Sequence, residues 1–154
     1  MEERVYHEMR AKEDEFWWHH GMRKIQEVFL NLCFNKNSRN KILDVGCGTG
    51  WMLKTLSKYG EVRGVDFSDI AVSHACSRGI GTVIKARAEN LPFDSKAFDL
   101  VTCFDVLYHR SINDDESVLR EFLRVLKPGG VLLIREPSFR WLYGWHDQMV
   151  HTRR

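Results

Sequence analysis

The chain has 154 residues, of which 44% are apolar and 29% are charged, a balance typical of one globular domain with one hydrophobic core. Its 23 basic and 21 acidic residues leave a net charge of +2, which is too small to indicate nucleic-acid binding through charge. The apolar runs are too short to span a membrane, so no transmembrane segment is predicted.

The charged start of the chain is not followed by an apolar segment, so we expect no secretory signal peptide. The cysteines are scattered and form no CxxC pair: Cys33, Cys47, Cys76 and Cys103. This spacing predicts neither disulfides nor a zinc site, and a reducing cytoplasm is the expected location.

The segment Val5–Cys33 is predicted to be helical. Its apolar side chains recur at helical spacing, at Met22, Ile25, Phe29 and Leu32. We expect this stripe to cover one face of a sheet. Residues 16–20, Phe-Trp-Trp-His-His, concentrate aromatic surface. Such side chains mostly serve packing, and a lid over a ligand is the alternative.

Strand-like and helix-like segments alternate after residue 40. The predicted strands are 41–45, 61–66, 82–85, 98–104 and 131–135. The predicted helices are 51–59, a helix capped by Ser68 that runs to about Arg78, and one capped by Asn113 that runs through Leu126. This alternation predicts an α/β fold, a parallel sheet with helices on both faces.

A glycine-rich turn follows the first strand, with glycines at Gly46, Gly48 and Gly50. Glycine allows positive φ and lets a ligand approach the backbone closely. The dinucleotide fingerprint GxGxxG would need its third glycine at position 51, which holds the bulky Trp51. No GK[ST] follows, so the turn is not a P-loop either.

Asp66 ends the second predicted strand. A carboxylate at this position can accept hydrogen bonds from the two hydroxyls of a ribose. The alternative is a helix-capping role, but Ser68 is already placed to cap the next helix. Together with the glycine turn, Asp66 predicts a nucleoside-containing ligand.

Five motifs occur in a characteristic order: Asp44–Gly50, Gly64–Ser68, Ala88–Phe93, Phe98–Val101 and Leu126–Gly130. In this order they resemble the class I S-adenosylmethionine-dependent methyltransferases, of the type 11-like kind, over residues 41–135. The resemblance implies a three-layer Rossmann-like fold with sheet order 3-2-1-4-5. Residues 1–40 would form a helical lid, and residues 41–154 would form the domain that binds S-adenosylmethionine and its product S-adenosylhomocysteine.

The flanks resemble one branch of that family. The aromatic pair Trp17-Trp18 stands before the fold, and His146-Asp147 and then Arg153-Arg154 stand near the end.

The resemblance implies a role for each matched residue. The turn Gly46–Gly50 would lie against the amino-acid part and ribose of the cofactor, and Asp44 would orient the turn. Asp66 would hold the ribose hydroxyls, and Phe67 would pack on the adenine. The implied cofactor-binding residues are Asp44, Gly46, Cys47, Gly48, Gly50, Asp66, Phe67, Ala88, Glu89, Phe104 and Asp105.

Two positions depart from the family pattern. Arg87 stands where relatives often have an acidic or small residue, and an adenine amino group cannot donate a hydrogen bond to an arginine side chain. Tyr108 stands where many relatives have glutamate, so no role is carried over to it.

The candidate catalytic residue is His109, which follows the fourth predicted strand. An imidazole with a pKa of about 6.5 suits a general base. The alternative is a loop histidine that packs or binds substrate. Tyr108 and His146 are weaker candidates. No histidine pair has an acidic or cysteine partner at fixed spacing, so no metal site is predicted.

The predicted function is methyl transfer from S-adenosylmethionine to a small-molecule, lipid or glycan acceptor. The first alternative is a cofactor-binding module with little activity that needs a partner chain. A nicotinamide-dependent oxidoreductase is disfavoured by Trp51. The strand Val131–Arg135 would be an apolar sheet edge, so we expect C-terminal residues, or a partner chain such as a second copy, to cover it.

Overall fold

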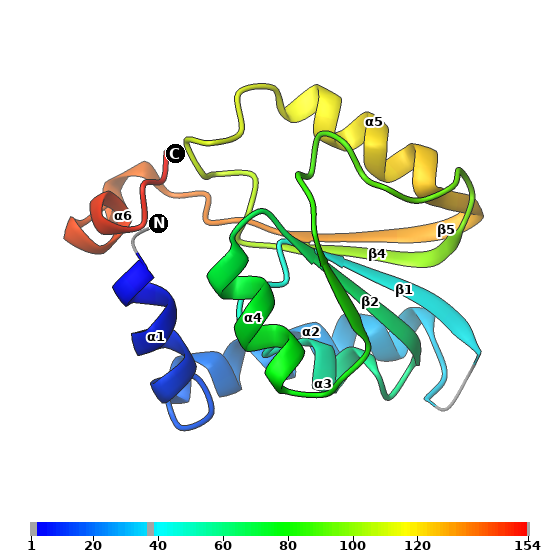
Figure 1. The fold of residues 1–154 in the computed structure, drawn as a ribbon, viewed down its shortest axis with the longest axis horizontal. Helices are drawn as coiled ribbons and strands as arrows, with labels where there is room; N and C mark the ends of the chain where they lie inside the picture. The colour runs from blue at the N-terminus through cyan, green and yellow to red at the C-terminus, as the bar shows by residue number, and fades with distance from the viewer. Residues whose placement is uncertain (1–2, 37–38, 154) are drawn as a thin grey trace.

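The computed structural model describes residues 3–36 and 39–153. They form a parallel five-stranded sheet in the order β3-β2-β1-β4-β5, with helices on both faces (Figure 1). The strands are β1 Asn40–Val45, β2 Gly60–Asp66, β3 Thr82–Lys85, β4 Phe98–Phe104 and β5 Leu126–Arg135. The predicted fold class and strand order are confirmed.

The helices are α1 Glu3–Lys12, α2 Trp17–Cys33, α3 Leu53–Leu56, α4 Asp69–Ser77, α5 Asp115–Val125 and α6 Trp145–Met149, with a 3-10 turn η1 at Arg140–Leu142. The predicted helix Val5–Cys33 is therefore two helices. A turn separates them, in which the N–H of Phe16 donates to the carbonyl of Lys12 at 2.9 Å. This break lets α1 lie against α4 while α2 packs under the sheet.

Two helix boundaries differ from the prediction and one agrees. The helix expected over residues 51–59 is reduced to the single turn α3, with turns on either side. Ser68 caps α4 as predicted. Asp114, not Asn113, caps α5, because its carboxylate accepts from two N–H groups of the first helical turn at 3.0 and 3.2 Å.

Two apolar layers enclose the sheet. On one face α5 contributes Val118, Phe122 and Val125 to an apolar layer that also includes Leu126, the first residue of β5. On the other face α2, α3 and α4 form a second layer, which includes Leu30, Leu53, Leu56 and Ala75. These layers hold the carboxyl ends of the strands in place at one side of the molecule.

The predicted buried stripe of α2 is wrong. Leu32 is 77% exposed, and Ile25 and Phe29 are about half exposed, whereas Gln26 and Leu30 are buried. The side of α2 that faces the core carries Leu30, which is buried in one layer with Leu53 and Leu56. Glu27 and Asn31, on the side toward α3, bond to Lys58 and Tyr59 at 2.9 and 2.8 Å.

β5 lies at the edge of the sheet and pairs with β4. The C-terminal segment does not cover its outer edge within the described residues. Instead Thr152 forms a bridge with His109, and the N–H of Arg153 donates to the carbonyl of Tyr108 at 2.7 Å. The segment thus closes over the loop after β4. None of the described helices is both long and apolar enough to cross a membrane.

Candidate functional site

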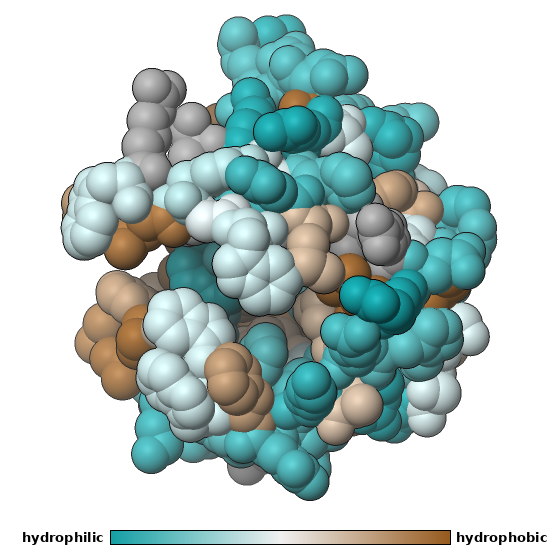
Figure 2. Space-filling model, turned by 90° about the vertical axis from the view of Figure 1, so that its left-hand side faces the viewer, coloured by the Kyte–Doolittle hydropathy of each residue, from teal (hydrophilic) through white to brown (hydrophobic). Residues whose placement is uncertain are grey.

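A cavity of about 560 Å³ opens at the carboxyl ends of β1, β2 and β4. The glycine turn and the ends of the strands form its inner wall. The N-terminal helices α1 and α2, which the resemblance predicts to be a lid and which we call by that name, form a second wall, and the C-terminal segment forms a third. Figure 2 shows the hollow on this face of the molecule. Its volume suits a small-molecule ligand, and its position is where ligands bind in open α/β sheets.

The glycine turn is held against β2. The N–H groups of Gly46 and Cys47 both donate to the carbonyl of Val65, at 2.8 and 3.0 Å. Gly46 and Gly48 have φ of +72° and +54°, which glycine adopts without strain. A Cβ at Gly46 would overlap a methyl of Val106, while one at Gly48 would meet no heavy atom of the described residues within 4 Å. Gly48 therefore leaves room for a ligand at the backbone.

Asp66 joins the turn to the end of β2. It is 6% exposed, and its carboxylate accepts from the N–H of Gly48 and from that of Ser68, each at 2.9 Å. Burial raises the pKa of Asp66. Each carboxylate oxygen keeps a lone pair for a further donor. Asp66 lines the cavity beside Phe67, which is 42% exposed.

Asp44 lies deeper in the same wall. It is 3% exposed and accepts a hydrogen bond from Thr102 Oγ1 at 2.6 Å. Burial raises the pKa of Asp44 to about 7. Thr102, on the neighbouring strand β4, was missed by the sequence, because the register of two strands far apart in the chain cannot be read from a motif.

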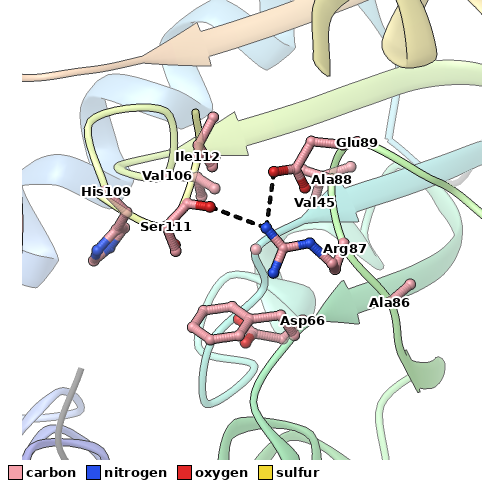
Figure 3. A pocket seen from close by; sticks show the side chains of 12 residues that line it. Val45, Asp66, Ala86, Arg87, Ala88, Glu89, Val106, His109, Ser111 and Ile112 are labelled. Carbon is pink, nitrogen blue, oxygen red and sulfur yellow. Dashed lines mark hydrogen bonds and ion pairs between the residues drawn. The ribbon is translucent and has the colours of Figure 1, made fainter. Parts of the chain in front are cut away.

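A smaller pocket of about 40 Å³ adjoins the cavity (Figure 3). It contains Ala88 and Glu89, which the resemblance places at the adenine edge. Arg87 crosses this pocket and donates to Glu89 Oε1 and to the carbonyl of Ser111, each at 2.9 Å. The arginine therefore links two loops by hydrogen bonds and forms an ion pair with the carboxylate of Glu89.

The end of β4 carries Phe104 and Asp105, both in the cavity wall. Asp105 has φ of +58° and forms an ion pair with Arg135, whose guanidinium also lies 5.5 Å from the centre of the Phe104 ring. Glu136 accepts hydrogen bonds from three successive N–H groups of residues 106–108, at 2.9, 2.8 and 3.3 Å. Arg135 and Glu136, which the sequence reading missed, hold the loop that carries His109.

His109 lines both the cavity and the smaller pocket. Burial lowers the pKa of His109, so its imidazole is neutral at neutral pH and can accept a proton. Burial, with Asp105 and Glu136 nearby, raises the pKa of Tyr108 and keeps the phenol protonated. His19 of the lid is a second cavity imidazole whose pKa is lowered by burial.

Residues 43–134 match the family described as "Methyltransferase domain". The match covers more than half of the chain. The chain belongs to the methyltransferase domain family. The class I resemblance read from the motifs is thereby confirmed.

Relatives of this methyltransferase domain agree with the match. The chain is 33% identical over 151 residues to the ubiquinone/menaquinone biosynthesis C-methyltransferase UbiE of Cronobacter sakazakii. This match covers 90% of this chain and 59% of that protein. It is 36% identical over 123 residues to a demethylmenaquinone methyltransferase of Geobacillus kaustophilus, covering 73% and 52%. The chain thus spans little more than half the length of these relatives.

A solved structure shares the architecture of this methyltransferase domain. It is that of an S-adenosylmethionine dependent methyltransferase from Mesorhizobium loti, with a TM-score of 0.60 and 25% identity over 70% of this chain and 51% of that chain.

The lid of this methyltransferase domain is attached through a buried acid that the sequence reading missed. Glu13 is 1% exposed, and its carboxylate accepts from Thr49 Oγ1 and from the guanidinium of Arg78. Arg78 also donates through Nε to the carbonyl of Thr49 at 2.8 Å. No motif marks this contact, because its three residues are distant in the chain. It connects the lid directly to the glycine turn.

Two more lid contacts reach the cavity. Tyr6 of α1 is 5% exposed, and burial and the charge of Asp66 raise its pKa to about 12. Trp51, which follows the glycine turn, lies 5.2 Å from the ring of His19 and beneath the guanidinium of Arg23 at 5.2 Å. The bulky residue that replaces the third fingerprint glycine therefore packs against the lid.

Proposed function

We propose that the cavity binds S-adenosylmethionine and that the chain transfers its methyl group to a small apolar acceptor. The observation that carries the proposal is the glycine turn. Its backbone is open at Gly48, and the carboxylate of Asp66 is bonded to that same glycine. A backbone surface and an adjoining carboxylate suit a ligand that combines a ribose with an amino-acid part.

Side chains of the cavity and of the adjoining pocket can be assigned to most parts of the cofactor. Asp66 would accept from the ribose hydroxyls and Phe67 would pack on the adenine, with Ala88 at its edge. The turn Gly46–Gly50 and the β4 end at Phe104 and Asp105 would hold the methionine part. The bound cofactor supplies a methyl group on a positively charged sulfur. Arg87 gives the adenine amino group no acceptor, so we assign it no contact with that group.

The rest of the cavity favours an apolar acceptor over a glycan. Aromatic and aliphatic side chains line it from the lid and the C-terminal segment: Phe16, Trp18, Met22, Pro137 and Val150. The polar side chains that these two segments add to the lining include Glu13, His19 and Asp147. The apolar side chains between them would bind an acceptor by removing apolar surface from water. The relatives named above for quinone biosynthesis make a quinone precursor the first acceptor to test.

Alignment of the acceptor with the methyl group would supply most of the acceleration, and such positioning can contribute ~7–11 kcal/mol. His109 would act as general base where the acceptor carries a proton to be lost, since its lowered pKa keeps the imidazole neutral. Glu136 fixes the loop that presents it.

Calorimetric titration with S-adenosylhomocysteine, S-adenosylmethionine and NAD tests the cofactor. We expect the first two to bind and NAD not to bind. Binding of NAD alone would support the oxidoreductase alternative and remove the main claim. Turnover of S-adenosylmethionine with a demethylmenaquinone analogue then separates an enzyme from a cofactor-binding module.

We also propose that the outer edge of β5, at Val131–Arg135, pairs with a strand of another chain. The edge strand is apolar, and the half-exposed Ile25 and Phe29 of α2 lie on the side of that helix away from α3. Light scattering during gel filtration tests it: a dimer is expected, and a monomer at high concentration would contradict it. The cytoplasmic location stays a prediction.

A further inference from the structure

Large aromatic side chains are exposed on two separate segments. We call them the aromatic rim, and its members are Phe16, Trp17, Trp18, Phe139, Trp141 and Trp145. Three of its indoles are more than two-thirds exposed: Trp17 at 71%, Trp141 at 78% and Trp145 at 72%. Leu142, between the last two, is 55% exposed. Soluble proteins rarely leave several such side chains together in water without a function.

The rim lies at the mouth of the cavity. Phe16 and Trp18 line the cavity from the lid side. Pro137 and Val150, from the segment that carries η1 and α6, line it from the opposite side. Figure 2 shows pale and brown side chains on both sides of the hollow. Whatever covers the rim therefore also meets the entrance to the site.

The rim is organised within each segment. The rings of Trp17 and Trp18 lie edge to face with their centres 5.9 Å apart, and those of Phe139 and Trp141 are also 5.9 Å apart. Such packing fixes the rings in position while their outer faces stay in water. Indoles combine an apolar face with a polar N–H, and they concentrate where a bilayer meets water.

The C-terminal part of the rim belongs to a stretch that is basic in sequence. The C-terminal stretch 137–154 contains three arginines in the sequence, and Asp147 is its one acidic residue. That aspartate is 6% exposed, and its carboxylate accepts from the N–H of Gly144 at 2.8 Å. A stretch that is basic in sequence, whose one acid is buried and which carries exposed indoles, is the kind of segment that binds anionic lipid surfaces.

We propose that the aromatic rim docks on the headgroup region of an anionic lipid bilayer, and that an apolar acceptor enters the cavity from that surface. Because no described helix can cross a bilayer, the contact is peripheral. A protein seated on the rim would close the entrance, whereas a bilayer both accepts the indoles and dissolves an apolar acceptor. The delivery of the acceptor rests on the proposed function; the docking does not.

Sedimentation with vesicles tests the docking. The whole chain is mixed with vesicles of phosphatidylcholine, and separately with an equal mixture of phosphatidylcholine and phosphatidylglycerol. We expect the chain to sediment with the anionic vesicles and much less with the neutral ones. The double variant Trp141→Ala, Trp145→Ala should lower the partition coefficient at least about tenfold. The matched control is Leu123→Ala, which removes a side chain on α5 that is 66% exposed and away from the rim.

Three results would overturn the proposal. Failure of the wild-type chain to bind anionic vesicles, or equal loss in the control, overturns the proposal. Association of the chain with itself through the rim, lost in the double variant while vesicles stay unbound, also overturns it. S-adenosylhomocysteine affinity is measured on the same proteins. The double variant should retain it, because neither indole lines the cavity, so failure of the docking and failure of the cofactor assignment are distinguishable.

Discussion

The inner wall of the cavity and its outer walls differ in the side chains that they contain and in how deeply these are buried. The inner wall consists of strand ends and the glycine turn, with the carboxylates of Asp44 and Asp66 buried and bonded. The outer walls consist of the lid and the C-terminal segment, and their lining includes aromatic side chains such as Phe16 and Trp18, each about half exposed. The inner wall can therefore present the same surface to one cofactor, while the outer walls have apolar surface suited to varied acceptors or to a bilayer. Substitutions at four positions test this difference between the walls.

The largest effect is expected at the turn itself. Gly46→Ala places a Cβ against Val106 on a backbone with φ of +72°. Strain and overlap of about 2 kcal/mol each should lower the free energy of unfolding by about 4 kcal/mol. Urea denaturation measures this. Gly79→Ala, with φ of +64° but open space around it, is the control and should cost about 1–2 kcal/mol. Equal losses of unfolding free energy in the two variants would show that overlap with Val106 does not contribute.

The next effect concerns the attachment of the lid. Glu13→Ala leaves the nearly buried guanidinium of Arg78 without its closest carboxylate. We expect a loss of about 3 kcal/mol in unfolding free energy, the lower end for breaking a buried pair. Hydrogen exchange should rise over residues 3–33. Glu8→Ala, whose partner Arg4 is exposed, is the control and should change stability little. Unaltered exchange in the first variant would show that Glu13 does not hold the lid.

A smaller effect is expected in cofactor affinity. Asp66→Ala removes the carboxylate proposed to hold the ribose, so S-adenosylhomocysteine should bind about tenfold more weakly, on the scale of a hydrogen bond to a charged group. Calorimetry measures this. Asp69→Ala removes an exposed carboxylate paired with Lys85 and should leave the affinity unchanged. An affinity that survives the loss of Asp66 would remove the ribose assignment.

The smallest effect is expected in the pH dependence of kcat/KM. Since burial lowers the pKa of His109, kcat/KM should fall only below about pH 6.5, the ordinary histidine value. The same shift makes the folded state less stable as pH falls below that value, because the unfolded chain then binds the proton more readily. His109→Gln should flatten the acid limb, and His151→Gln, at an exposed position, should keep it. An acid limb that persists without His109 would assign it to another group.

Much of the inner wall could be predicted because its signals are local. The glycines stand at fixed spacing after an apolar strand, and Ser68 caps the helix that follows Asp66, so neighbouring residues specify both turns. Strand order followed from the alternation of strands and helices together with the family resemblance. At Asn113 the local signal misplaced the cap by one residue, because two adjacent polar side chains both suit a cap.

The inner wall of this methyltransferase domain could be predicted from the sequence alone: the strands, the turn and the acids at the ends of the strands. The remaining features depend on how distant segments pack together. Tertiary packing turned α2 so that Leu30 is buried in one layer with Leu53 and Leu56 while Leu32 is exposed, because the apolar pattern of one helix does not specify which of its faces the neighbouring elements cover. It brought Glu13 to Arg78, and it laid Arg87 across the smaller pocket. Each of these contacts joins residues far apart in the chain, and folding alone brings them together.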